Sequence, residues 1–233
     1  MGFEIIITCE HAGNEIPESY SNLFPADAVG VVASHRGWDP GAWGVATYLA
    51  DRLNAPLFSC HTSRLLIEVN RSLHHLELFS EFTAPLDDEA REKLVREVYR
   101  PYRDSVIERL KLAGRPVLHL SVHSFTPVLH NKVRAMEIGL LFDPARPLEV
   151  ACCDFIKDSL QRSLPAMHVA FNEPYSGVDD GFTTSLRDLF PSERYAGIEI
   201  ELNQKLIGTH LWEDMEEALV DCIRDLCDLP VNP

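Results

Sequence analysis

Polar side chains that can bind a metal ion or move a proton stand at the ends of four apolar segments of this chain. They are His11, Asn70 with Arg71, His123, and Glu199 or Glu201. The segments themselves, such as residues 3–9 and 116–122, are rich in the apolar residues of a buried strand. Ligands in open α/β sheets bind outside the carboxyl ends of the strands. We therefore expect these side chains to converge on one site.

Two histidines and a carboxylate, with a fourth position left to water, form a common ligand set of a hydrolytic zinc site. His11 and His123 supply the imidazoles, and either Asp39 or Glu15 supplies the carboxylate. We favour Asp39, because it begins a predicted helix that would hold the carboxylate rigidly, whereas Glu15 precedes a segment typical of a surface loop. His35, one turn before Asp39, is a further candidate as a ligand or as a hydrogen-bond partner of a ligand.

A zinc ion in such a site lowers the pKa of its water to about 7, and a nearby glutamate then accepts the proton. Glu199 and Glu201 alternate with isoleucine and leucine, so they share one face of a strand and both are candidates for this base. Two imidazoles and a carboxylate also suit iron, cobalt or manganese. The residues therefore predict one divalent metal ion, with zinc as the first choice.

The elements that must position these residues alternate between strand-like and helix-like periodicity. This alternation predicts an α/β layered domain in which helices cover a central sheet. Strands are predicted at residues 3–9, 57–60, 64–70, 116–122, 136–143, 166–172 and 195–203. Helices are predicted at residues 39–56, 87–113, 147–163 and 211–229. The polar segment 172–194 is rich in turn residues and is predicted to be a long functional loop.

Composition limits the partners of the protein. The 233 residues carry a formal net charge of −15, which argues against an extended nucleic-acid footprint or an anionic membrane surface. No apolar run reaches the ~20 residues needed to span a bilayer, and the first residues lack the features of a secretory signal. None of the six cysteines lies in a C-x-x-C pair, so free thiols are expected. We expect one domain over residues 1–233 in the cytoplasm, acting on a small molecule.

Six segments together resemble the N-formylglutamate amidohydrolase family, and they occur in the order found in that family. They are CEHAGNEIP, HRGWDPGA, SRLLIEVNRS, HSFTPV, NEPYSG and IEIELNQKLI. This family is related to zinc carboxypeptidases and aspartoacylases. The resemblance implies a three-layer, phosphorylase/hydrolase-like fold, in which a mixed central sheet has helices on both faces and one zinc ion at its carboxyl edge.

The resemblance also implies roles for individual residues. By motif, the early histidine of the family is His11, the Asn-Arg pair is Asn70 with Arg71, the second histidine is His123 and the general base is Glu201. The segment HAGNE departs from the compact His-x-x-Glu motif of the relatives, because it has one more residue. The resemblance therefore leaves the choice between Asp39 and Glu15 open.

The activity implied is hydrolysis of the amide bond of an N-formyl or other N-acyl amino acid, with glutamate as the namesake of the family. Arg71 would stabilise the developing oxyanion together with the zinc ion. Arg64, and also Arg187, would bind substrate carboxylates through bidentate hydrogen bonds. Asn172 and Tyr175 would shape the substrate end of the site. Two alternatives remain, a carboxypeptidase-like zinc peptidase and a non-catalytic α/β binding protein.

Overall fold

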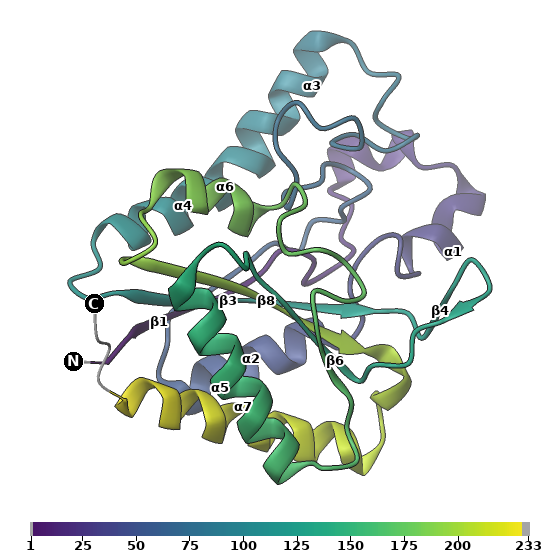
Figure 1. Ribbon diagram of the computed structural model, residues 1–233. Coiled ribbons are helices and arrows are strands. Elements are labelled where there is room, and N and C mark those ends of the chain that lie inside the picture. Colours follow the sequence, from purple (N-terminus) through teal and green to yellow (C-terminus); the bar gives the residue numbers. More distant parts are fainter. Residues whose placement is uncertain (1, 230–233) are drawn as a thin grey trace.

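Six strands form the central sheet of the computed structural model, which describes residues 2–229 (Figure 1). Their order across the sheet is β2-β1-β3-β8-β6-β7. Neighbouring strands are parallel except at β6, which runs antiparallel to β8. Their bounds are β1 Glu4–Cys9, β2 Leu57–Ser59, β3 Val117–Phe125, β6 Ile138–Leu141, β7 Val169–Phe171 and β8 Tyr195–Asn203. The predicted mixed sheet is confirmed.

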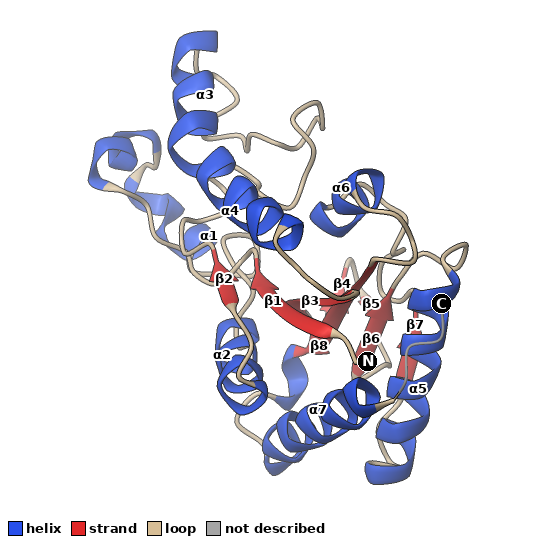
Figure 2. Cartoon of the chain, turned by 90° about the vertical axis from the view of Figure 1, so that its left-hand side faces the viewer, coloured by secondary structure: helices blue, strands red, loops and turns tan. Residues whose placement is uncertain are grey.

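Helices cover both faces of this sheet. One face is covered by α2 (Ala42–Leu53), α5 (Pro147–Ser163) and α7 (His210–Asp228), which lie below the sheet in Figure 1. The other is covered by α4 (Arg100–Lys111) and α6 (Phe182–Leu189). Figure 2 shows α3 (Asp88–Leu94), which leads into α4 through the π-helical turn Val95–Tyr99 and extends away from the sheet. The shorter elements are Glu18–Leu23, Ala26–Ala28, α1 Val29–Val32, β4 Val128–Leu129, β5 Lys132–Val133 and Gln204–Leu206.

The alternation of residues along β3 gives the two faces of the sheet different surroundings. Leu118, Leu120 and Val122 belong to the apolar core under α2, α5 and α7. The intervening residues His119 and His123 point to the opposite face, because successive side chains of a strand alternate in direction. All nine residues of β3 are buried. The strand therefore buries its two histidines on the face opposite Leu118, Leu120 and Val122.

Two predicted elements differ from the structure. Residues 64–70 form turns rather than a strand, although Leu66 and Ile67 are buried in the core beneath α4. A run of apolar residues indicates that a segment is buried, but it does not distinguish a hydrogen-bonded strand from packed turns. The predicted loop 172–194 contains α6, whose Phe182 and Leu186 lie one helical turn apart and are fully buried. Hydrophobic packing of that single turn outweighs the polar composition of the segment.

Smaller differences concern the ends of elements. The helix predicted from residue 39 begins at Ala42, because Gly41 has a left-handed conformation with φ 86° before the first turn. Strand β3 extends to Phe125, so His123 lies within the strand rather than after its end. The helix at residues 147–163 and the strand at residues 195–203 have the predicted bounds.

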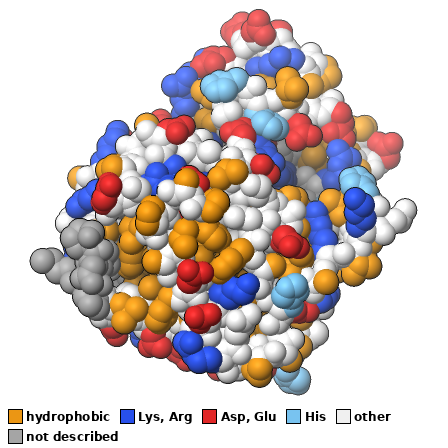
Figure 3. All heavy atoms as spheres, in the orientation of Figure 1, with side chains coloured by type: hydrophobic (Ala, Val, Ile, Leu, Met, Phe, Trp, Pro, Cys, Tyr) orange, Lys and Arg blue, Asp and Glu red, His pale blue; other side chains and the backbone are white. Residues whose placement is uncertain are grey.

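Charged side chains of both signs are spread over the surface. Figure 3 shows acidic and basic side chains interspersed over one face of the molecule, and no broad basic area gathers there. Among the described residues, no helix is both long and apolar enough to cross a bilayer.

Candidate active site

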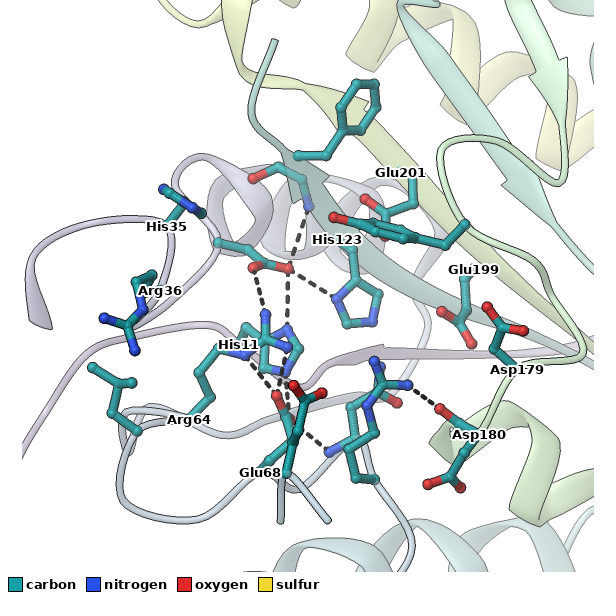
Figure 4. Close-up of a pocket in the computed structure, with 18 of the residues that line it drawn as sticks. His11, His35, Arg36, Arg64, Glu68, His123, Asp179, Asp180, Glu199 and Glu201 are labelled. Carbon is teal, nitrogen blue, oxygen red and sulfur yellow. Dashed lines mark hydrogen bonds and ion pairs between the residues drawn. The ribbon is translucent and has the colours of Figure 1, made fainter. Parts of the chain in front are cut away.

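A cavity of about 630 Å³ opens where β1, β3 and β8 end, and most of the predicted site residues line it (Figure 4). His11, Asp39, His123 and Glu201 line it. So do other predicted residues, namely His35, Arg64, Asn70, Arg71, Tyr175 and Glu199. The structure thus brings together side chains from segments that are widely separated in the sequence.

The sheet places the two central side chains directly opposite each other. His123 on β3 is the register partner of Glu201 on β8, and both point to the same face. On the other side of Glu201, its partner on β6 is Gly139. A Cβ atom at Gly139 would collide with the carbonyl oxygen of Glu173 and lie 3.2 Å from the Cβ of Glu201. The glycine therefore lets the chain pack closely behind Glu201.

His11 and Asp39 come from the loops that follow β1 and precede α2. The backbone N–H of Asp39 donates to the carbonyl of His11 at 3.0 Å, which joins the two loops. The backbone N–H of Ser124 lies 3.4 Å from Asp39 Oδ2 and ties the same carboxylate to β3. These contacts fix the carboxylate beside both histidines without the helix start that we had expected to hold it.

His11, Asp39 and His123 form a buried group with converging ligand atoms. Nδ1 of His11 lies 3.1 Å from Asp39 Oδ2, and Nδ1 of His123 lies 2.9 Å from the same oxygen. The three side chains offer ligand atoms that all lie within 4.8 Å of one another. Ligands of a tetrahedral zinc ion at ~2.0–2.1 Å from the metal are about 3.3 Å apart, close to the two distances to Asp39 Oδ2, so the group could hold one ion.

The alternative carboxylate, Glu15, does not belong to this group. Its side chain is exposed, and its backbone forms an isolated bridge with Thr62. His35 also stays apart, since it is exposed at the edge of the cavity. Burial and the charge of Arg36 lower the pKa of His35. Of the two carboxylates left open by the sequence, the geometry favours Asp39.

Each histidine of the group has a second carboxylate behind it, which our reading of the sequence missed. Nε2 of His11 lies 2.6 Å from Glu68 Oε1, and Nε2 of His123 lies 3.1 Å from Glu10 Oε2. Such partners orient an imidazole and raise its basicity towards a metal. The signal was present, because Glu10 directly follows a buried strand and Glu68 interrupts an apolar run. An acidic residue in such a position needs a buried partner.

The partners of Glu10 and Glu68 differ in charge. Glu10 accepts hydrogen bonds from neutral hydroxyl groups, whereas Glu68 forms an ion pair with Arg64. The Tyr102 hydroxyl donates to Glu10 Oε1 at 2.7 Å, and the Ser121 hydroxyl donates to Oε2 at 2.6 Å. Arg64 Nε donates to Glu68 Oε2 at 2.6 Å, and the same guanidinium lies 3.4 Å from Asp39 Oδ1. Arg64 is therefore already paired within the group.

The electrostatics of this group fit a divalent cation. Burial alone would raise the pKa of Asp39, Glu10 and Glu68, but the facing histidines and Arg64 outweigh it and hold each pKa well below its usual range. Three ionised carboxylates and one guanidinium leave two negative charges. The same carboxylates raise the pKa of His11 and His123, so two protonated imidazoles can balance this charge. When both imidazoles are neutral, as metal ligands must be, the two negative charges remain. A buried charge of this size requires compensation. One divalent ion would provide it.

Glu199 and Glu201 share a face of β8 as predicted, but their surroundings differ. Glu201 is 5% exposed, and its Oε2 has no hydrogen-bond partner among the described residues. Burial raises the pKa of Glu201 to about 7. Glu199 accepts a hydrogen bond from the Thr183 hydroxyl. Of the two, Glu201 is the carboxylate with an unpartnered buried oxygen among the described residues, beside His11, Asp39 and His123.

Asn70, Arg71 and Tyr175 occupy the wall and the mouth of the cavity. Asn70 Oδ1 accepts from the backbone N–H of Phe182 at 2.8 Å, which fixes the start of α6. The Arg71 guanidinium donates to the backbone carbonyl of Asp180. Tyr175 is 43% exposed at the mouth. Arg71 and Tyr175 therefore keep polar atoms that a substrate could contact.

Two other predicted residues hold the neighbouring loop in place. Arg187 does not line the cavity, since its Nε lies 3.0 Å from Glu149 Oε1 and it also donates to the Gly197 carbonyl at 2.8 Å. The structure therefore does not bring Arg187 to the cavity, where we had expected it to bind substrate. Asn172 is also absent from the residues that line the cavity, and its Oδ1 accepts from the backbone of Phe142 and Gly177.

The chain is similar to known proteins over most of its length. A model of the N-formylglutamate amidohydrolase family matches residues 3–208. The crystal structure of a gene product from Agrobacterium tumefaciens has a TM-score of 0.78 and 27% identity, covering 97% of this chain and 92% of that chain. The crystal structure of N-formylglutamate amidohydrolase from Ralstonia eutropha shares the fold, with a TM-score of 0.67 and 17% identity over 97% and 95% of the two chains.

A search of curated proteins finds no significant match. The family model nevertheless spans most of the sequence, including every residue assigned above to the cavity. Its description is the one that the six sequence segments had suggested. The chain belongs to the N-formylglutamate amidohydrolase family.

Proposed function

We propose that the protein is a metal-dependent hydrolase that cleaves the amide bond of an N-formyl or other N-acyl amino acid, such as N-formylglutamate. Membership of the family supports a hydrolase acting on a small molecule. The observation that carries the proposal is the buried group His11, Asp39 and His123 beside the unpartnered carboxylate of Glu201. A ligand set and a free base in one cavity are the two parts that metal-assisted hydrolysis requires.

His11, Asp39 and His123 would hold one divalent ion, with zinc as the expected metal. A bound ion of this kind supplies Lewis-acid polarisation of the amide carbonyl and makes water a stronger acid. Glu68 and Glu10 keep the Nε2 atoms of the two histidines hydrogen-bonded, so that both Nδ1 atoms face Asp39. The shared direction of the two Nδ1 atoms supports the proposed ligand set.

Glu201 would act as the general base and then as the acid. Its Oε2 is free to accept a proton from the attacking water, since no described side chain or backbone group occupies it. A pKa of about 7 allows the same carboxyl group to pass that proton to the departing amine near neutral pH. The low exposure of Glu201 keeps the transferred proton out of exchange with bulk water.

Arg71 would bind a substrate oxygen. Its side chain lines the cavity and donates one hydrogen bond to a backbone carbonyl, which leaves further N–H donors of the guanidinium for a ligand. The developing oxyanion of the amide is one such oxygen, and stabilising it is usually a large contribution to catalysis. Tyr175 and Asn70 would border the bound substrate.

The test combines metal analysis with turnover. Protein purified without chelator should contain about one divalent ion per chain and hydrolyse N-formyl amino acids. A chelator should remove the activity, and zinc should restore it. A metal content well below one ion per chain, with no activity after metal is added, would overturn the proposal. Hydrolysis of peptides but of no N-acyl amino acid would favour a zinc peptidase instead.

A further inference from the structure

The three arginines that line the cavity differ in whether they form ion pairs with carboxylates. Arg36 pairs with Glu81 at 2.6 Å in an exposed position. Arg64 is shared between Glu68 and Asp39, as described above. Arg71 forms no ion pair among the described residues, and the contact of its guanidinium is with a backbone carbonyl. The cavity therefore has one guanidinium whose charge no carboxylate has neutralised.

Carboxylates line the cavity wall next to α6. Figure 4 shows Asp179, Asp180 and Glu199 together on one side of the site, opposite His35 and Arg36. The Asp180 carboxylate accepts from the backbone N–H and hydroxyl of Ser72 at 3.1 and 3.0 Å. Glu199 accepts from a threonine hydroxyl. These donors are neutral, and no ion pair with Asp179, Asp180 or Glu199, the acidic wall, forms among the described residues.

The interior of the cavity adds one more carboxylate, and the mouth is lined by large uncharged side chains. Glu201 is 5% exposed, and its Oε2 has no partner among the described residues. At the mouth, Leu76 is 97% exposed and stands with Leu129 and Tyr175 among the residues that line the cavity. A volume of about 630 Å³ lies within the range of cavities that enclose drug-sized ligands. A substrate with a side chain longer than that of glutamate therefore fits.

We propose that this cavity selects N-acyl amino acids with a single carboxylate and a neutral or cationic side chain, in preference to dicarboxylates such as N-formylglutamate. This inference rests on the proposed function. If Arg71 binds the substrate carboxylate, a second carboxylate inside the cavity meets only paired arginines or the acidic wall. Arg134 is not part of the cavity lining, and its guanidinium lies over the Tyr175 ring at the mouth. If Arg71 binds the oxyanion, even the first carboxylate must share a paired arginine. Like charges placed together across a binding surface discriminate strongly against the wrong ligand.

The experiment compares three substrates on the metal-loaded protein. N-formylglutamate and N-formylglutamine have almost the same shape and differ by one charge, and N-formyllysine adds a positive charge. We expect kcat/KM to be higher for the glutamine and lysine derivatives than for the glutamate derivative, by roughly tenfold or more at low salt. Added salt should narrow this difference, because it screens charges at the open mouth of the cavity.

Two variants test whether the acidic wall causes the selectivity. Asp179→Asn removes one charge from an exposed position in the wall and should raise the relative kcat/KM for N-formylglutamate. Asp188→Asn removes the same charge from an exposed position of α6 that does not line the cavity, and it should leave the ratio unchanged.

Equal or higher kcat/KM for N-formylglutamate in the wild-type protein would overturn the inference and leave the proposed function standing. The same holds if both variants change the ratio alike, because the net charge of the chain would then be responsible. Hydrolysis of none of the three substrates would overturn the proposed function and the inference with it.

Discussion

The two faces of the central sheet are built from alternate residues of the same strands, and near the cavity they carry different chemistry. On β3, Leu120 and Val122 face the apolar core under α2, α5 and α7, whereas His123 lines the cavity. On β8, Ile200 lies in that same core and Glu201 lines the cavity. One step along a strand thus separates a side chain that stabilises the fold from one that serves the site. Neighbouring substitutions should therefore alter stability and activity independently.

The polar face itself changes along the strand. His119 lies deep in the sheet, where Thr8 Oγ1 is 2.8 Å from its Nε2 and the Tyr195 hydroxyl is 2.7 Å from its Nδ1. Both ring nitrogens thus contact neutral hydroxyl groups. His123, four residues later, lies between carboxylates. A histidine with neutral partners is suited to a structural role, whereas one between carboxylates is suited to hold a cation.

His123→Ala should have the largest effect on the function of the polar face. The variant loses one of the three proposed ligands, so we expect its metal content to fall to background and its activity with it. Val122→Ala, one residue away on the apolar face, is the matched control and should keep both the metal and the activity while losing stability. Metal content after dialysis and the denaturation midpoint separate the two outcomes. A His123→Ala protein that binds metal normally would contradict the ligand assignment.

Glu201→Gln should keep the metal and lose turnover. Glutamine has nearly the same shape as glutamate but cannot accept the proton, and general-base catalysis typically contributes about 10²–10⁴-fold. We expect kcat to fall within that range at unchanged metal content. Glu199→Gln is the control on the same strand face and should retain more activity, because the structure gives Glu199 a hydroxyl partner. The reverse order of the two variants would make Glu199 the base.

His119 should make the stability of the fold depend on pH. Burial lowers the pKa of His119 to about 4 in the folded protein, whereas the unfolded chain binds a proton below about 6.5. Between these two values only the unfolded state binds the extra proton. The stability that the neutral His119 contributes is therefore fully present above pH 6.5 and is lost as the pH falls towards 4. The loss amounts to about 3 kcal/mol.

Urea denaturation of wild type and His119→Gln between pH 7 and 4 measures this contribution. Glutamine cannot titrate, so the difference in the free energy of unfolding between the two proteins should become smaller as the pH falls. A difference that stays constant would show that folding does not lower the pKa of His119.

Glu10→Gln should weaken metal binding without removing it. Glutamine can still accept the hydrogen bond from Tyr102, but it brings no charge to the Nε2 atom of His123. Loss of such a partner typically costs about 10–100-fold in metal affinity. Competition with a chelator measures the affinity, and Glu4→Gln, at the other end of β1, should leave it unchanged. Equal affinity in wild type and Glu10→Gln would exclude a positioning role for Glu10.

Ile200→Val should have the smallest effect. It removes one methyl group from the fully buried apolar face next to Glu201 and should cost about 0.5–1.5 kcal/mol of stability. The denaturation midpoint measures this cost. The kcat should be unchanged at a temperature where the variant is folded. A fall in kcat comparable to that of Glu201→Gln would mean that the two faces are not independent.

Much of the fold was predictable, because periodicity and composition are local properties. Strand β8 and helix α5 have the bounds that their patterns predict, and the polar positions of His11, His123 and Glu201 were readable beside apolar runs. The six segments that resemble the family led to the correct family. Residues 64–70 were predicted wrongly, because burial without strand pairing leaves the same apolar pattern as a strand.

The sequence by itself determined which residue types alternate along each strand, and so which side chains had to lie on a polar face. Only the tertiary structure decided what those side chains meet. The pairing of Glu68 with His11, and of Glu10 with His123, depends on how distant segments pack together. The same packing removed Arg187 from the cavity and left Arg71 without a carboxylate. Such partners lie far apart along the chain, so no local pattern records them.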